Sequence, residues 1–146
     1  MAGLPASVLF ACTTNSVRSP MAEAYLKHLH GQRIFVDSVG LRTREIDGFV
    51  IAAMAEMGID VSMHRAKTFD DLEDASFDLV ISLSPEAHHR AMEMTRTMSC
   101  EVVYWPTFDP TAVDGTREMQ LDAFRQVRDA LAARIQERFP LPRKPG

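Results

Sequence analysis

The sequence predicts an α/β protein: a single three-layer domain with a central four-stranded parallel sheet and helices on both faces. Short apolar runs alternate along the chain with segments in which apolar residues recur at helical spacing, a pattern typical of βαβ units. The chain of 146 residues is long enough for one domain with a sizeable core. We expect this domain to span residues 1–139, and the proline-rich residues 140–146 to form a flexible tail.

The elements follow in order along the chain. The expected strands are residues 8–11, 33–38, 77–83 and 101–105. Two helices are expected to begin at Ser-Pro pairs, with Ser19 and Ser84 as N-caps and proline at the first helical position. A third helix covers residues 49–57 and ends at Gly58. The last helix begins after Thr116 and reaches about residue 139, with its apolar side chains on one face.

Composition narrows the possible partners. The net charge of -4 gives no support for a nucleic-acid or membrane surface, and no apolar run is long enough to span a bilayer. The two cysteines are too few for a disulfide framework and do not have zinc-site spacing. No basic region precedes Leu4, so we expect no secretory signal. We therefore expect a cytoplasmic protein, a monomer or weak dimer, that binds neither nucleic acid nor membrane.

The first chemical motif lies between the first strand and the first helix. Cys12 ends the strand and Arg18 follows six positions later, across a polar loop. A helix N-terminus and a nearby arginine both stabilise a thiolate, which is the nucleophilic form of cysteine. Loop amides and a guanidinium can also grip the oxygens of a phosphoryl group. We expect Cys12 to be the nucleophile and Arg18 to bind phosphate, rather than a buried structural cysteine and an ordinary surface arginine.

The residues between and after these two complete the expected phosphate-binding loop. The substrate-binding residues that we expect beside Cys12 and Arg18 are Thr13, Thr14, Asn15, Ser16, Val17 and Ser19.

This stretch resembles the low-molecular-weight protein tyrosine phosphatase family, which also includes a branch of thiol-dependent arsenate reductases. The family pattern is Cys-x-Gly-Asn-x-Cys-Arg-Ser-Pro directly after the first strand. The chain matches it at Cys12, Asn15, Arg18, Ser19 and Pro20. The resemblance continues through most of the chain and implies a cysteine-dependent enzyme that needs neither metal nor cofactor.

Two residues depart from the family pattern. Thr14 stands where the family usually has glycine, which questions the geometry of the loop because glycine often marks a backbone conformation that other residues resist. Val17 stands where many members have a second cysteine, so a neighbouring thiol that could protect the nucleophile as a disulfide is missing.

A second motif follows the fourth strand. The family has an Asp-Pro pair there whose aspartate is the general acid, and Asp109 matches it. By resemblance, Asp109 protonates the leaving oxygen and later deprotonates the attacking water; the alternative is an ordinary turn residue. Trp105 and Phe108 form either an apolar wall for a substrate ring, which we slightly favour, or part of the core.

Other polar residues have structural and functional interpretations. By resemblance, Ser38 joins Asn15 and Ser19 in a hydrogen-bond network that holds the loop open; a simple turn residue is equally compatible. His64 could be a catalytic base, but we expect a structural role. Cys100 is expected to be a free structural thiol, and the adjacent His88 and His89 to lie on a solvated helix face.

The resulting hypothesis is a phosphatase that acts through a cysteinyl-phosphate intermediate on a phosphorylated protein or a small phosphomonoester. Protein phosphotyrosine is the first choice of substrate. The small hydroxyl residue Ser16 also resembles bacterial phosphoarginine phosphatases. Arsenate reduction is a further alternative, and with no cysteines near the third strand it requires an external thiol such as glutathione or mycothiol. The last alternative is a phosphate-binding module without turnover.

Overall fold

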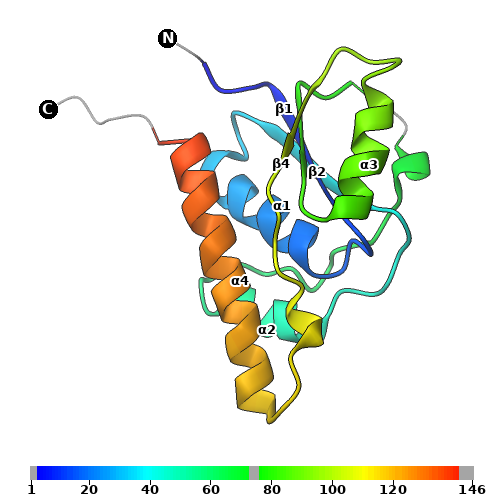
Figure 1. Ribbon diagram of the computed structural model, residues 1–146. Helices are drawn as coiled ribbons and strands as arrows, with labels where there is room; N and C mark the ends of the chain where they lie inside the picture. Colours follow the sequence, from blue (N-terminus) through cyan, green and yellow to red (C-terminus); the bar gives the residue numbers. More distant parts are fainter. Residues whose placement is uncertain (1–2, 73–75, 142–146) are drawn as a thin grey trace, which may run out of the picture.

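The computed structural model describes residues 3–72 and 76–141 and confirms the predicted fold class (Figure 1). The strands are β1 (Ser7–Cys12), β2 (Phe35–Gly40), β3 (Leu79–Ser82) and β4 (Glu101–Tyr104). The helices are α1 (Arg18–His30), α2 (Gly48–Ala55), α3 (Pro85–Met94) and α4 (Arg117–Arg138), with short 3-10 turns η1 (Phe69–Asp71) and η2 (Pro110–Ala112). The sheet has the order β2-β1-β3-β4, and all its neighbours pair in parallel.

Side chains of β1 alternate between two cores. Val8, Phe10 and Cys12 face the core that α1, α2 and α4 share, whereas Leu9 and Ala11 face α3 and η1 on the other side. Both faces of β1 are therefore buried, which explains why its sequence is continuously apolar. Figure 1 shows α4 and α3 on opposite sides of the sheet.

The element boundaries differ from the predicted ones by one or two residues. The second strand begins at Phe35 rather than residue 33, because the N–H groups of Arg33 and Ile34 still donate to the His30 carbonyl in the turn after α1. The same strand continues to Gly40, which pairs with Cys12. Helix α2 begins at Gly48, and Gly58 takes a positive φ of 75° just after it, as predicted for the residue that ends the helix.

The predicted cap of α3 is confirmed, the structure adds a cap for α4 that was not predicted, and the expectation for one histidine is wrong. Ser84 accepts from the N–H of Ala87 at 3.3 Å, and Thr116 accepts from the N–H of Met119 at 3.1 Å. The expectation of a solvated His88 is wrong. Its Nδ1 lies 2.8 Å from Ser82 Oγ and its ring stacks on Tyr104, because α3 packs over β3 and β4.

Residues 142–146 of the predicted tail lie outside the described residues, while the preceding Leu141 is exposed. Within residues 3–72 and 76–141, no helix combines the length and apolar character that crossing a membrane would require.

An ion-pair network fastens α2 to α4. Glu56, just past the end of α2, accepts from Arg125 at 2.8 Å and from Arg128 at 2.7 Å. Arg128 also donates to the carbonyl of Ala53 at 2.8 Å. Hydrogen bonds from Arg125, the larger contribution, and from Arg128 lower the pKa of Glu56 to about 2. Since the segment before α2 leads directly from β2, this network also fixes one end of that segment.

The pH dependence of stability should report this network. A carboxylate whose pKa is lowered in the folded state stabilises the protein above its unfolded pKa, near 4.5, and loses that contribution as pH falls toward 2. We expect Glu56→Gln to unfold at lower urea concentration than wild type at pH 7, and the difference to shrink between pH 4.5 and pH 2.5. Fluorescence of the single tryptophan, Trp105, can follow unfolding. Glu137→Gln removes an exposed carboxylate without an ion-pair partner in the described part, and should not lower the midpoint.

Candidate active site

The site is built on the loop between β1 and α1. Cys12 is the last residue of β1, is 1% exposed, and lies with its Sγ 2.9 Å from Ser19 Oγ. The predicted N-cap role of Ser19 is wrong: Val17 is the N-cap and provides no side-chain cap, and Ser19 lies within the first turn. The Ser19 hydroxyl forms a hydrogen bond with Cys12 Sγ instead of capping the helix. The first N–H groups of α1 are thereby left for another acceptor.

Asn15 holds the loop from behind. It is fully buried and has a φ of 53°, a left-handed conformation that asparagine tolerates better than most residues. Its Nδ2 donates to Ser19 Oγ and to Ser38 Oγ, both at 2.8 Å. Its Oδ1 accepts from the backbone N–H of Lys67 at 3.0 Å, which fixes the orientation of the amide. The predicted link among Asn15, Ser19 and Ser38 is confirmed.

The conformation of Asn15 also explains why Thr14 can stand where the family usually has glycine. Within the described residues, Asn15 is the only non-glycine residue with a positive φ. Thr14 therefore occupies its position without the backbone conformation that would demand glycine. Its Oγ1 instead lies 2.6 Å from Ser16 Oγ, so the two side chains brace each other.

A buried acid extends the network away from the sulfur. Ser38 Oγ donates to Glu23 Oε1 at 2.5 Å, and Lys27 pairs with the other oxygen of Glu23 at 2.5 Å. His64 Nε2 lies 3.1 Å from both the backbone and side-chain oxygens of Asn15, so this nitrogen must donate. His64 contacts the back of the loop, which supports the structural role expected for it.

The backbone of the loop is turned so that its carbonyls point outward. The carbonyls of Thr13, Thr14 and Ser16 accept from N–H groups of residues 41–47. No backbone N–H of residues 13–18 donates to another group in the described part of the chain. A run of free N–H groups at a helix N-terminus forms an anion-binding hollow.

Arg18 reaches from the first turn of α1 toward the second motif. It is 9% exposed; one guanidinium nitrogen donates to the carbonyl of Thr107 at 3.0 Å and another to Thr13 Oγ1 at 3.3 Å. Thr13 in turn donates to Ser84 Oγ at 3.2 Å. The guanidinium is thus held between the loop and the segment that carries Asp109.

The two motifs share one cavity of about 580 Å³. Of the predicted site residues, Cys12, Thr13, Thr14, Ser16, Val17, Arg18 and Asp109 line it. Asn15 and Ser19 do not line it and lie behind the loop. Asp109 accepts from the N–H and the hydroxyl of Thr111, at 3.0 and 2.7 Å, which fixes its carboxylate at the start of η2. The chemical roles of these residues stay predictions.

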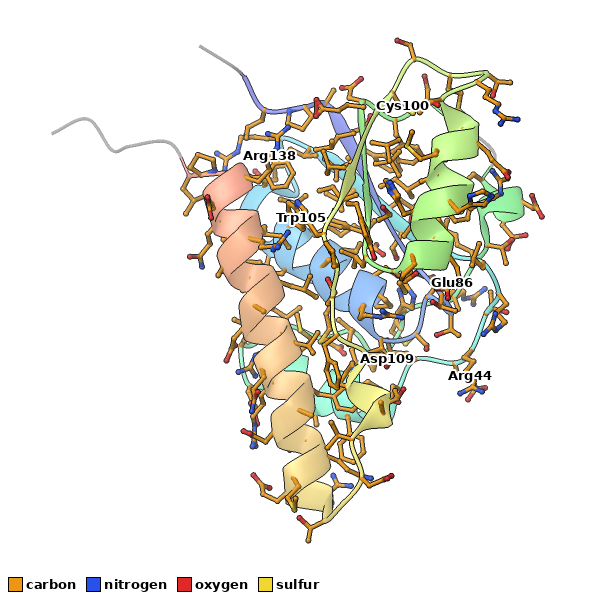
Figure 2. The ribbon with its side chains drawn as sticks, in the orientation of Figure 1. Arg44, Glu86, Cys100, Trp105, Asp109 and Arg138 are labelled. Carbon is orange, nitrogen blue, oxygen red and sulfur yellow. The ribbon has the colours of Figure 1, made fainter. Side chains whose placement is uncertain are left out.

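The opposite wall of the cavity comes from the segment after β2. Its lining residues there are Arg42, Arg44, Glu45 and Asp47, with Thr111 beside Asp109. The polar residues of this segment carry no local sequence pattern that marks them as part of a site. Figure 2 shows Arg44 and Asp109 toward the same end of the molecule.

Neither predicted aromatic residue lines this cavity. Trp105 packs against Phe10 and under the Arg134 guanidinium, so it belongs to the core (Figure 2). Phe108 is 60% exposed and lines a separate groove against α4. The cavity lining is therefore mainly polar and has no aromatic side chain.

Cys100 is a free thiol at the other end of the sheet. It precedes β4, and the strand registers place it five residue positions from Cys12 along the strand direction, about 16 Å at the rise of a β-strand. A disulfide requires Cα atoms within about 7 Å. Burial also raises the pKa of the Cys100 thiol, which disfavours its reactive form. Figure 2 shows Cys100 far from Asp109.

A tetrahedral oxyanion would sit among the free N–H groups with the Cys12 thiol beside it. This is the arrangement of enzymes in which a cysteine attacks an oxyanion. The chain belongs to the low molecular weight phosphotyrosine protein phosphatase family, whose model matches residues 7–139. The predicted family is thereby confirmed.

Named relatives divide between two activities. An arsenate reductase of Halalkalibacterium halodurans is 36% identical over 129 residues, which cover 88% of this chain and 91% of the relative. The crystal structure of an arsenate reductase in a phosphate-binding state has a TM-score of 0.71 at 30% identity, covering 90% of this chain and 94% of that one. The tyrosine phosphatase amsI of Erwinia amylovora has a TM-score of 0.75 at 20% identity, covering 92% and 91%, and shows the fold alone.

Gly40 is a site residue that sequence reasoning did not single out. A Cβ at this position would lie 2.7 Å from the backbone nitrogen of Asn15 and 2.9 Å from the carbonyl carbon of Thr14. We expect Gly40→Ala to displace the loop and reduce turnover of an aryl phosphate or of arsenate roughly 10²-fold, the cost of a misplacement near 1 Å.

Gly48→Ala is the matched control, since an added Cβ there meets nothing within 4 Å. It should keep wild-type activity, and circular dichroism should show that both variants fold. Full activity in Gly40→Ala would contradict the close packing behind the loop.

Proposed function

We propose that the protein reduces arsenate, with Cys12 as the nucleophile and an external thiol as the reductant. The observation that carries this proposal is the 36% identity to an enzyme named arsenate reductase over nearly the whole of both chains. The polar cavity supports it, because a cavity without an aromatic wall suits a small oxyanion better than a phenyl ring. This ranking reverses the one drawn from the sequence, in which phosphatase came first.

The chemistry uses the observed groups in two stages. The Cys12 thiolate attacks arsenic(V), held by loop N–H groups and Arg18, and one oxygen leaves as water with a proton from Asp109. A thiolate of the reductant then attacks Cys12 Sγ; the S–As bond breaks, its electron pair stays on arsenic, and arsenite is released. A second reductant thiol cleaves the resulting mixed disulfide, so two thiols are oxidised for each arsenate reduced.

The distance between the two cysteines supports an external thiol. Cys100 lies about 16 Å from Cys12 along the strand direction, too far to attack its sulfur in the folded protein.

Phosphomonoester hydrolysis is the second candidate, and the missing resolving cysteine favours it. Hydrolysis needs only water for its second stage, with Asp109 first as acid and then as base. The substrate would be a phosphotyrosine or phosphoarginine protein or a small phosphomonoester.

One assay series separates the candidates. We expect arsenite to form only when arsenate and a thiol such as glutathione are both present, and Cys12→Ser to lower the rate by at least about 10³-fold. Asp109→Asn should lower it about 10²-fold. Hydrolysis of an aryl phosphate, phosphotyrosine or phosphoarginine is measured in parallel. Efficient hydrolysis with no arsenite would instead establish the phosphatase.

The role of Cys100 has its own test. We expect Cys100→Ser to keep the wild-type rate of arsenate reduction with an external thiol, and neither protein to release arsenite without one. Mass spectrometry of the oxidised protein should find the reductant attached to Cys12 and no bond between the two cysteines. Loss of activity in Cys100→Ser would contradict the external-thiol mechanism.

A further inference from the structure

Two arginines at the mouth of the catalytic cavity have no ion-pair partner among the described residues. Arg42 and Arg44 are exposed, and both line the cavity that contains Cys12. The intervening Thr43 does not line it. The side chains of Arg42 and Arg44 therefore both contribute to the cavity wall.

Their backbone is fixed close to the nucleophile. The N–H of Arg42 donates to the carbonyl of Thr13 at 3.1 Å, and the N–H of Arg44 donates to that of Thr14 at 3.2 Å. These acceptors are one and two residues from Cys12. The backbone of the two arginines is therefore held by the loop that follows Cys12, and their side chains line the same cavity as its sulfur.

Most of the other charged side chains that line the cavity already have hydrogen-bond partners. Arg18 is held by the loop and Thr107, and Asp47 caps α2 by accepting from the N–H of Phe49 at 2.8 Å. Apart from Asp109, the remaining charge is Glu45, which is exposed and has no partner in the described part. Among the described residues, the mouth thus offers Arg42 and Arg44 as cations and Glu45 as an anion, all three without an ion-pair partner and in addition to Asp109.

We propose that Arg42 and Arg44 bind the carboxylates of an anionic peptide thiol, which is the reductant of the reaction. This inference rests on the proposed function. A γ-glutamyl tripeptide thiol such as glutathione carries a carboxylate on each side of its cysteine and one ammonium group, and this pattern complements two arginines and Glu45. Arginine and carboxylate pair in a bidentate fashion that also orients the ligand.

The size of the cavity agrees with two ligands. Arsenate has five heavy atoms and fills roughly 100–150 Å³ if each takes about as much space as a water molecule. The cavity of about 580 Å³ therefore keeps most of its volume when arsenate is bound, and Arg42 and Arg44 are among the residues that line it. Each residue of an extended peptide spans about 3.5 Å, so the carboxylates of a tripeptide thiol can reach the mouth while its sulfur approaches Cys12.

The test compares one thiol in two charge states. Arsenite formation is measured against the concentration of glutathione and of glutathione diethyl ester, in wild type, in Arg42→Ala/Arg44→Ala and in Arg96→Ala. Arg96 is exposed, does not line the cavity and has no ion pair in the described part, so it controls for loss of positive charge. Taking the ratio of variant to wild type for each thiol cancels the intrinsic reactivity of that thiol.

We expect the double variant to raise the KM for glutathione about tenfold and the KM for the diester less than about twofold, as for two partly exposed pairs. Turnover at saturating thiol should stay near wild type. Added salt should raise the glutathione KM of wild type and not that of the double variant. Arg96→Ala should behave as wild type with both thiols.

The possible failures are distinct. Equal effects on both thiols, or none, with arsenite still formed, would overturn the thiol subsite and leave the proposed function standing. No arsenite with any thiol, together with hydrolysis of an aryl phosphate, would overturn the proposed function and the subsite with it. A readout without arsenate is the rate at which Cys12 forms a mixed disulfide with oxidised glutathione. The double variant should slow this reaction and not the reaction with neutral hydroxyethyl disulfide.

Discussion

The side-chain amide of Asn15 is the interaction on which the site depends. Its two N–H bonds reach Ser19 and Ser38, and its oxygen is taken by the backbone N–H of Lys67. Because Ser19 Oγ accepts from Asn15, its own proton is left for Cys12 Sγ at 2.9 Å or the Val39 carbonyl at 3.5 Å, and the sulfur is the nearer of the two. Because Ser38 also accepts, it donates onward to Glu23. One buried amide therefore sets the direction of every hydrogen bond from an internal carboxylate to the nucleophile.

The same residue shapes the hollow in front of the sulfur. A left-handed residue costs roughly 1–2 kcal/mol, and Asn15 adopts that conformation where its side chain is fully satisfied. Turning the chain there sends the carbonyls of Thr13, Thr14 and Ser16 toward residues 41–47, while their N–H groups donate to no other group in the described part of the chain. Gly40 permits the close approach, since a larger residue would meet the loop backbone. The anion site is thus a consequence of where β2 and its following segment lie.

The sequence predicts features that depend on neighbouring residues, and it does not predict those that depend on residues far apart in the chain. The strand before Cys12, its spacing to Arg18 and the Ser84 cap are local, and they are found as predicted. Ser19 has the pattern of a cap, yet its hydroxyl bonds the sulfur because the sheet brings Asn15 and Ser38 together. The preference for Trp105 in an aromatic wall of the cavity is wrong because it also depends on long-range packing. The packing of α4 places Trp105 against the core, and the local sequence does not show this. Arg42 and Arg44 have no local signal at all.

The loop itself does not choose between hydrolysis and reduction. Both reactions begin with a thiolate attacking the centre of a tetrahedral oxyanion, and free N–H groups with an arginine beside them would stabilise that step in the same way. They diverge in what arrives next: water at phosphorus, or a second thiol at Cys12 Sγ. On the functions proposed above, that choice belongs to the rest of the cavity, which Asp109 and the two arginines line. We therefore expect specificity to be decided by residues after β2 and β4, outside the motif that identifies the family.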